Sequence, residues 1–350
     1  MKKLLLLFLL LCPLKVDAIS ASAYIVMDSD VARVLEGSNM HTPYLIASTT
    51  KIMTTLVVLN NSDIHQTVLI NDEVLKSYGS GIYVEIGEKI TILDLLYGLM
   101  LRSGNDAAIA LASEVGGSMA GFVTLMNETA LALGMTKTNF LNSHGLEEKD
   151  DTGNTSSAYD MGLLSSYAIK NSLYSKIVST EKYIVKTNFK TYLWHNKNKL
   201  LTDYEYCTGG KTGFTKLARR TLVTTASKDA INLTVVTFKD GDDFHDHQTL
   251  YEKYFKTLKK YPILKKGAFP TKYEQTFINE DFAMSLTKEE YKNIVVSINY
   301  SDNNATNMIG EVTVSLSDQV YFRTPIYQEN TTTKKVSLWH KIKRIFNIND

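Results

Sequence analysis

Residues 83–112 read YVEIGEKITILDLLYGLMLRSGNDAAIALA, and they hold two helices with a turn between them. The spacing predicts a helix over Thr91–Met100, because apolar residues recur on one face after a threonine that can cap the helix. An alanine-rich helix is predicted over Asp106–Val115, where Gly116-Gly117 ends it. Ser103-Gly104-Asn105 therefore lies in a tight turn between two helices.

Further helices flank this stretch, and strands lie outside them. The order is strands, helices, strands and a last helix, which favours an α+β fold whose sheet is built from both ends of the domain, with a helical insert. Helical spacing recurs at 46–59, 122–133, 158–168 and 244–258, and strand patterns lie at 23–27, 31–35, 183–187, 221–226 and 231–238.

The chain divides into a large domain and a small one. The predicted boundary falls at Tyr261-Pro262, so the first domain covers 19–262. Short strand runs beyond the boundary predict a small β-rich domain at 263–330. The remaining segment, 331–350, is assigned to a linker and a terminal helix.

The first 18 residues have the pattern of a secretory signal peptide. Met1-Lys2-Lys3 is basic, 4–11 is an apolar run too short to span a bilayer comfortably, and Val16-Asp17-Ala18 offers a cleavage site. An uncleaved anchor and a lipoprotein signal at Cys12 are the alternatives. We expect an exported protein whose mature chain keeps only Cys207 and so has no internal disulfide.

The terminal helix predicts contact with a membrane surface. About a dozen helical residues cannot span a bilayer, but a helix with an apolar face and basic residues can lie in an anionic interface. A helix packed on the protein's own surface is the alternative. The apolar residues are Leu338, Trp339, Ile342, Ile345 and Phe346, and the basic ones are Lys335, Lys341, Lys343 and Arg344.

The composition is that of an ordinary globular protein. Of 350 residues, 44% are hydrophobic and 21% are charged, which argues against a disordered chain, a collagen-like repeat or a polytopic membrane protein. The 38 basic and 37 acidic side chains nearly balance, so no nucleic-acid partner is predicted.

Three short motifs carry chemistry. On a helix, Ser48 and Lys51 lie one turn apart, and a lysine of lowered pKa can take the serine proton. Alone the spacing is weak, because it recurs at Ser179-x-x-Lys182 and Ser285-x-x-Lys288. A solvated surface pair is the alternative.

The other two motifs are also weak when taken separately. The hydroxyl and amide of Ser103-Gly104-Asn105 can relay a proton and hold a substrate amide, or simply cap a helix. Lys211-Thr212-Gly213 can bind a carboxylate at a strand edge, where glycine admits a substrate backbone, or simply form a glycine-rich turn.

Taken together and in this order, the motifs resemble the low-molecular-mass penicillin-binding proteins of the serine D-alanyl-D-alanine carboxypeptidase type, peptidase family S11. Residues 83–112, Thr138–Leu146 (TNFLNSHGL) and Ala158–Met161 (AYDM) are similar to the same family. The resemblance covers 23–260 strongly. It implies a β-lactamase/D,D-peptidase-like domain, with an antiparallel sheet flanked by helices and a helical subdomain, followed by the β-rich domain.

The resemblance also assigns roles to residues. Ser48 would be the acylated nucleophile, Lys51 its general base and Ser103 the proton shuttle to the leaving D-alanine. Asn105 would bind the substrate peptide, and Lys211 and Thr212 its terminal carboxylate. Gly213 would let the substrate backbone approach, and the backbone N–H groups of Ser48 and Phe214 would form the oxyanion hole.

The implied function is removal of the terminal D-Ala from peptidoglycan stem peptides at the outer face of the bacterial cytoplasmic membrane. β-Lactams would be covalent inhibitors, and the chemistry requires no metal or other cofactor. A D,D-endopeptidase, a β-lactamase and a non-catalytic wall-binding or β-lactam-sensing protein are the alternatives. The sequence does not favour a β-lactamase, because the expected E-x-x-L-N stretch is missing between the second and third motifs. Glu147 and Glu148 lie there in a polar loop without it.

Three further features each allow a functional and a structural interpretation. Arg219 follows the third motif and adds bulk and charge near the expected cleft, or is a solvated strand residue. Cys207 is better read as a small strand residue than as a nucleophile. His245-Asp246-His247 permits a metal site, but it opens a helix whose N-terminus favours acidic residues.

Overall fold

The computed structural model describes residues 19–301 and 307–329. The predicted signal peptide at 1–18 and the predicted linker and terminal helix at 331–350 lie outside the described residues. The chain forms two compact units that divide between Thr257 and Leu258. The sequence placed this division at Tyr261-Pro262. The structure places it earlier because Lys259–Leu264 pairs as a strand within the second unit.

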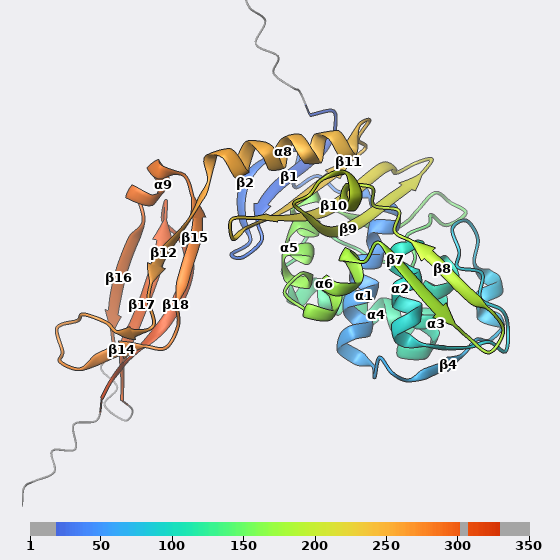
Figure 1. Cartoon of the computed structure of the whole chain (residues 1–350), viewed down its shortest axis with the longest axis horizontal. Helices are drawn as coiled ribbons and strands as arrows, with labels where there is room; N and C mark the ends of the chain where they lie inside the picture. Colours follow the sequence, from blue (N-terminus) through green and yellow to red (C-terminus); the bar gives the residue numbers. More distant parts are fainter. Residues whose placement is uncertain (1–18, 302–306, 330–350) are drawn as a thin grey trace, which may run out of the picture. The chain divides into compact units, whose positions relative to one another are not determined.

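The first unit contains an antiparallel five-stranded sheet in the order β2-β1-β11-β10-β9. The two ends of the unit supply its strands, as the α+β prediction required, and that prediction is confirmed. Helix α8 covers one face of the sheet and α5 the other (Figure 1). The strands and helices are β1 (Ala23–Asp28), β2 (Arg33–Ser38), β9 (Cys207–Thr215), β10 (Arg219–Lys228), β11 (Ile231–Phe238), α5 (Ala158–Ala168) and α8 (Asp243–Thr257).

The helical part of the first unit lies between β2 and β9 in the chain. It holds the 3-10 helices η1 (Ala47–Thr50) and η2 (Asp72–Lys76), and the helices α1 (Lys51–Asn61), α2 (Ile92–Leu101), α3 (Asn105–Gly116), α4 (Met119–Ala132), α6 (Ser172–Ser179) and α7 (Leu200–Asp203). Three two-stranded ladders join these helices: β3 (Tyr44–Leu45) with β6 (Thr155–Ser156), β4 (Thr67–Leu69) with β5 (Lys89–Thr91), and β7 (Lys182–Lys186) with β8 (Thr191–His195).

Helix α2 forms as its sequence predicts. The Thr91 hydroxyl accepts a hydrogen bond from the backbone N–H of Asp94 at 3.1 Å, which satisfies a free donor of the first turn. Leu95, Leu96 and Leu99 are fully buried in the core. Helix α3 ends where Gly117 takes a left-handed φ of +68°. The two helices that flank the Ser103 turn are thus each set by local sequence, α2 by its cap and buried leucines and α3 by its left-handed terminal glycine.

Strand boundaries differ from the prediction where turns use left-handed residues. Strand β2 begins at Arg33, two residues after the predicted start at 31, because the preceding turn extends to Ala32, at φ +52°. The hairpin of β10 and β11 turns at Asp229-Ala230, both with positive φ, rather than at Ser227-Lys228-Asp229. Two consecutive left-handed residues suit the right-handed twist of the flanking strands.

The second unit is built mainly of strands, with a five-stranded antiparallel sheet in the order β13-β14-β18-β17-β16 and a two-stranded ladder of β12 and β15. The elements are β12 (Lys259–Leu264), β13 (Gly267–Ala268), β14 (Thr276–Ile278), β15 (Phe282–Leu286), α9 (Lys288–Lys292), β16 (Val295–Tyr300), β17 (Met308–Leu316) and β18 (Gln319–Gln328).

Across the described residues, no single helix is long and apolar enough to cross a membrane, while α3 and α4 reach the required length and apolarity only as a pair bent by 85°.

Candidate active site

Ser48 lies in η1, the short turn that leads from β3 into α1. Ala47, just before it, has a positive φ of 46°, a conformation that costs free energy in a residue other than glycine. Two hydrogen bonds to the Ile46 carbonyl oxygen hold the turn. The donors are Thr49 Oγ1 at 2.6 Å and Thr221 Oγ1 on β10 at 3.1 Å. The Ser48 side chain remains partly exposed.

Lys51 opens α1 one turn after Ser48 and is completely buried. Its Nζ donates to Ser48 Oγ at 3.2 Å, to Asn105 Oδ1 at 2.8 Å and to the His144 carbonyl oxygen at 2.6 Å. Burial, followed by the positive charges of Lys211 and Lys197, holds the pKa of Lys51 well below its usual range, while Asp106 opposes the shift. A lysine in this setting can exist as the neutral amine that a general base requires.

The turn between α2 and α3 brings Ser103 and Asn105 to the same place. Ser103 is almost fully buried and has a left-handed φ of 62°. Asn105 begins α3 and bridges Lys51 and the backbone. Its Oδ1 accepts from Lys51 Nζ, and its Nδ2 donates to the Tyr78 carbonyl oxygen at 2.6 Å. The amide of Asn105 is thereby fixed in orientation.

The third motif lies on β9, the edge strand of the sheet. Lys211 is buried, and its Nζ donates to the Thr212 carbonyl oxygen at 2.7 Å. Burial, with the charge of Lys197 second, lowers the pKa of Lys211 to about 7. A Cβ on Gly213 would lie 2.4 Å from Thr221 Oγ1 and 3.0 Å from the Ser48 nitrogen, so only glycine allows η1 to approach the strand this closely.

A cavity of about 450 Å³ brings the three motifs together. Of the predicted residues, Ser48, Ser103, Thr212, Gly213 and Phe214 line it. Lys51, Asn105 and Lys211 do not line the cavity, and the first two are bonded to each other. The sequence missed the rest of the lining, which is Ser80, Lys197, Lys199, Arg220, Asp243 and Phe244.

Arg220, rather than Arg219, is the arginine of the cavity. Arg219 sits at the hairpin turn with a φ of 61° and is exposed. Arg220 pairs across the strands with Phe214, forms an ion pair with Asp243 and lies over the Phe244 ring at 5.5 Å. Successive strand residues point to opposite faces, so a shift of one position brings the charge to the cavity, where Arg220 remains open to solvent.

Cys207 and His247 serve the fold rather than the chemistry. Burial raises the pKa of Cys207 to about 11, which disfavours a thiolate. His247 is buried, with Nδ1 2.6 Å from Thr224 Oγ1 and Nε2 3.1 Å from Thr237 Oγ1. Both ring nitrogens are thus bonded to threonines, and no group of three His, Cys, Asp or Glu in 19–301 and 307–329 is placed to hold a metal ion.

Glu147 and Glu148 are held by nearby loops and strands. Glu147 accepts a hydrogen bond from the Thr215 hydroxyl on β9, and its carbonyl oxygen accepts from the Tyr78 hydroxyl at 2.9 Å. Glu148 accepts from Asn142 Nδ2 at 3.3 Å. These bonds tie the 147–148 loop to the strand that carries the third motif.

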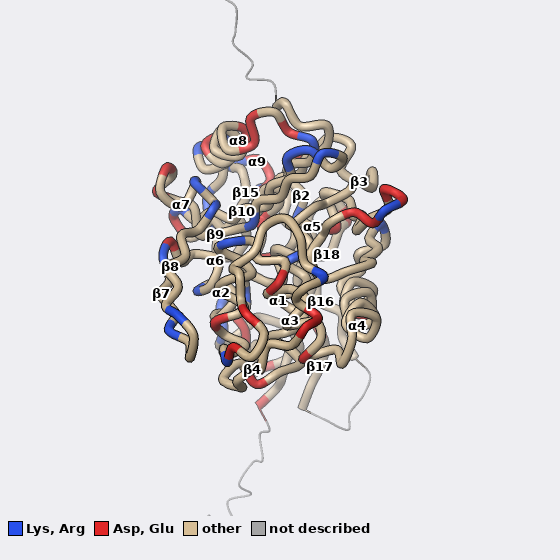
Figure 2. Tube along the Cα trace, turned by 90° about the vertical axis from the view of Figure 1, so that its right-hand side faces the viewer, with Lys and Arg blue, Asp and Glu red and all other residues tan. Residues whose placement is uncertain are grey.

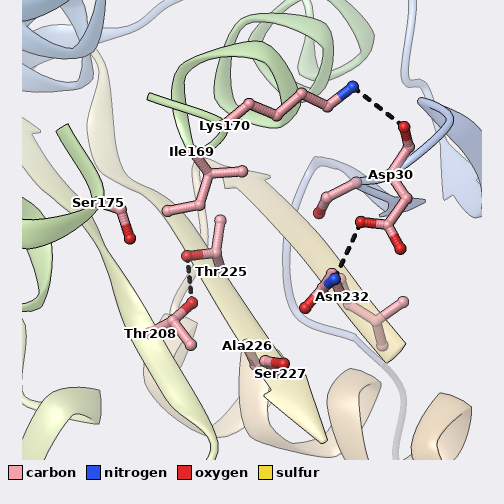
Figure 3. Close-up of a pocket in the computed structure, with 11 residues that line it drawn as sticks. Asp30, Ile169, Lys170, Ser175, Thr208, Thr225, Ala226, Ser227 and Asn232 are labelled. Carbon is pink, nitrogen blue, oxygen red and sulfur yellow. Dashed lines mark hydrogen bonds between the residues drawn. The ribbon is translucent and has the colours of Figure 1, made fainter. Parts of the chain in front are cut away.

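A second cavity, of about 370 Å³, contains none of the motif residues (Figure 3). Asp30 lies at one side, where its backbone oxygen accepts from Lys170 and its carboxylate accepts from Asn232 at 2.9 Å. Thr208 and Thr225 share a hydrogen bond of 2.7 Å across β9 and β10. The lysine of this second cavity, Lys170, is bonded to Asp30 rather than to a serine, whereas Lys51 contacts Ser48 beside the first cavity. The first cavity is therefore the candidate active site.

We expect a methyl group at Gly145 to disrupt the Ser48 turn. Gly145 has a φ of +88°, and a Cβ there would lie 1.9 Å from the Ala47 carbonyl oxygen. Gly145→Ala should destabilise the fold by about 2–5 kcal/mol and displace Ser48 from Lys51, and thermal unfolding measures the loss of stability. Gly117→Ala is the matched control, because its φ is +68° but nothing lies within 4 Å. Equal losses of thermal stability in the two variants would contradict this reading.

Known proteins share this sequence and fold. A family model described as peptidase S11, D-alanyl-D-alanine carboxypeptidase, matches residues 13–242. The D-alanyl-D-alanine carboxypeptidase DacF of Bacillus subtilis is 33% identical over 224 residues, which cover 62% of this chain and 57% of DacF. DacB2 of Mycobacterium tuberculosis is 33% identical over 215 residues, which cover 61% of this chain and 73% of DacB2.

Solved structures agree with the sequence match. Penicillin binding protein 6B from Escherichia coli superposes with a TM-score of 0.70 at 26% identity, covering 88% of this chain and 95% of that one. Penicillin binding protein 5 from Haemophilus influenzae gives a TM-score of 0.73 at 24% identity, with coverages of 89% and 96%. The D,D-peptidase-like fold and the family resemblance predicted from three motifs are both confirmed. The chain belongs to the S11 peptidase family of D-alanyl-D-alanine carboxypeptidases.

Proposed function

We propose that this protein is a serine D,D-carboxypeptidase that releases the terminal D-alanine from peptidoglycan stem peptides. The observation that carries the proposal is the contact of Ser48 Oγ with the buried amine of Lys51 beside the cavity. Family membership supplies the substrate class. The match covers 57% of DacF, so the activity of the relatives is carried over to this chain as part of the proposal.

The reaction begins with attack of Ser48 Oγ on the carbonyl carbon of the penultimate D-alanine. Lys51 takes the hydroxyl proton as the C–O bond forms. The oxyanion receives hydrogen bonds from the backbone N–H groups of Ser48 and Phe214. The C–N bond then breaks, and the proton passes from Lys51 through Ser103 to the leaving D-alanine nitrogen.

Water completes the cycle by attacking the Ser48 ester. Lys51 again accepts a proton, from the water, and returns it to Ser48 Oγ as the shortened peptide leaves. Thr212 on the cavity wall binds the terminal carboxylate, and the buried Lys211 beside it supplies the positive charge. Asn105 is assigned to the peptide chain, a role that requires its amide to exchange one of its present bonds for the substrate. A β-lactam acylates the same oxygen, but its leaving group stays tethered after ring opening, so the ester is expected to hydrolyse slowly.

The proposal is tested by comparing two reactions of the purified enzyme. We expect D-alanine release from a peptide ending in D-Ala-D-Ala, with penicillin acting as a slowly reversed inhibitor. Rapid penicillin turnover without D-alanine release would identify a β-lactamase instead. Neither reaction would point to a non-catalytic wall-binding protein. Cleavage of cross-linked dimers in preference to the pentapeptide would identify an endopeptidase.

The two lysines predict a pH profile for kcat/KM on a neutral D-Ala-D-Ala peptide. Lys51 must be deprotonated, and burial with the charges of Lys211 and Lys197 lowers its pKa and so favours the free amine. Lys211 must be protonated to hold the carboxylate, so activity should fall as pH rises through about 7, the pKa of Lys211. Lys197→Gln removes a charge that lowers this pKa, so the alkaline limb should move to higher pH. A limb that stays fixed would contradict the assignment.

We also propose that the protein is exported and held at the outer face of the cytoplasmic membrane. The sequence pattern of 1–18 supports export, and the apolar and basic residues of 331–350 support attachment at the interface.

Removing residues 334–350 should release the protein from membranes, because this deletion removes the apolar face and the basic residues together. Fractionation of cells carrying the full-length and shortened chains measures the effect. A shortened chain that still sediments with membranes would refute the anchor.

A further inference from the structure

Two lysines of the cavity lie outside the three motifs. Lys197 and Lys199, named here the lysine rim, come from the connection between β8 and α7, whereas Lys211 lies on β9. Both line the cavity together with Ser48. Figure 2 shows basic residues (blue) near β8, α7 and β9. The cavity therefore has a second source of positive charge from a separate segment of the chain.

The lysine rim is held in place by its backbone. The Lys197 N–H donates to the Leu101 carbonyl oxygen at the end of α2, at 3.1 Å. Asn198 between the two lysines is buried, and its Oδ1 accepts from the Leu200 N–H at 3.2 Å. With Asn198 turned inward, both flanking side chains remain exposed, and Lys197 Nζ donates to Ser80 Oγ at 3.1 Å.

The positive charge of the lysine rim is not balanced by a neighbouring carboxylate. In the described parts of the chain, no ion pair involves Lys197 or Lys199, whereas Arg220 is paired with Asp243. Lys197 is exposed as a whole residue, but partial burial of its amine, with the charge of Arg102 second, lowers its pKa. A ligand carboxylate would supply the missing counter-charge, since charge-assisted hydrogen bonds to lysine are strong.

We propose that the lysine rim binds a carboxylate in the peptide segment that precedes D-Ala-D-Ala, so that the enzyme prefers acidic stem peptides. This inference rests on the proposed carboxypeptidase function. The terminal carboxylate is assigned to Lys211 and Thr212 on β9, so a group bound by the lysine rim is a second, separate anion. The preference is a property of Lys197 and Lys199 rather than of the motifs that carry the chemistry.

The test compares two peptides that differ by one group, acetyl-Glu-D-Ala-D-Ala and acetyl-Gln-D-Ala-D-Ala. For the full-length enzyme we expect kcat/KM to be about five- to tenfold higher for the glutamate peptide at low ionic strength. This ratio should shrink towards one near 0.5 M salt, because added salt screens exposed charges. In the K197Q/K199Q double variant the ratio should be near one already at low salt.

The matched control is Lys216→Gln, which removes an exposed lysine that follows β9 but does not line the cavity. It should leave both rates and their ratio unchanged. Cleavage of both peptides by the unmodified enzyme at equal rates would overturn the inference and leave the carboxypeptidase function standing. A ratio retained in the double variant would also overturn it. Release from neither peptide would overturn the proposed function, and the inference with it.

Discussion

Ser48→Ala should abolish covalent labelling by penicillin and reduce D-alanine release by at least about 10⁴-fold. The change removes the oxygen that is proposed to form the ester, and within 19–301 and 307–329 no other hydroxyl is hydrogen-bonded to Lys51 Nζ. Ser48 is partly exposed, and its side chain bonds only to Lys51 Nζ among the described residues, so the fold should be unaffected. Intact-mass analysis and a D-alanine assay measure the two effects.

The chain offers a matched control for this experiment. Ser179 has the same Ser-x-x-Lys spacing but is exposed, and its hydroxyl donates to the Lys176 carbonyl oxygen at 3.2 Å. Ser179→Ala should label and turn over like the unmodified protein. Labelling that survives Ser48→Ala would refute the assigned nucleophile.

Lys51→Met should reduce the rate of acylation by about 10²–10⁴-fold while the protein stays folded. Methionine has nearly the same length, but it cannot accept the Ser48 proton. The change leaves Asn105 Oδ1 and the His144 carbonyl oxygen without their lysine donor, which costs about 1–3 kcal/mol for each group. Removal of a buried amine close to Lys211 and Lys197 offsets part of that loss.

Two measurements distinguish a role of Lys51 as the general base from a purely structural role. Thermal unfolding reports the stability of the variant, and stopped-time penicillin labelling reports its acylation rate. Lys182→Met, at the lysine of the exposed Ser179 motif, is the control and should change neither. Acylation by folded Lys51→Met within tenfold of the unmodified rate would exclude Lys51 as the base.

Sequence patterns predicted the parts of the fold that repeat with a period. Helices α2, α3 and α5 match their predicted ranges to within one or two residues, because buried leucines and alanines recur every three or four positions and caps mark the ends. Short ladders such as β3 with β6 were missed. Each of these strands has only two residues, which are too few to show the alternation of a strand, so the pairing is set by the packing around them.

The candidate site could be predicted only in part. Ser48, Ser103 and Thr212 carry recognisable motifs, and the structure places all three at one cavity. Lys197 and Lys199 carry no such signal, since lysines in a polar connection usually lie on a solvated surface. Their place at the cavity follows from the bond of the Lys197 backbone to the end of α2, which sequence spacing does not reveal.

Arg219 and Arg220 show how a shift of one residue along a strand changes which charge reaches the cavity. The sequence drew attention to Arg219, which follows the third motif. In the structure Arg219 takes the left-handed conformation that glycine favours, and Arg220 lines the cavity. The charge that borders the cavity therefore comes from the neighbour of the residue that the sequence singled out.

The site holds its chemistry at a cost to stability. Ala47 and Ser103 both take left-handed φ values beside the reacting groups, and two lysines are fully buried there. Each feature disfavours the folded state by itself. Each also suits the proposed reaction, because the turns bring Ser48 and Asn105 to Lys51 and burial lowers the pKa of the proposed base.

The most direct test is the intact mass of the full-length protein during incubation with penicillin over several hours. We expect one adduct per chain that forms quickly, persists for hours and is absent from Ser48→Ala. An unmodified mass throughout, or rapid loss of penicillin without an accumulated adduct, would refute Ser48 as the nucleophile of a penicillin-binding carboxypeptidase.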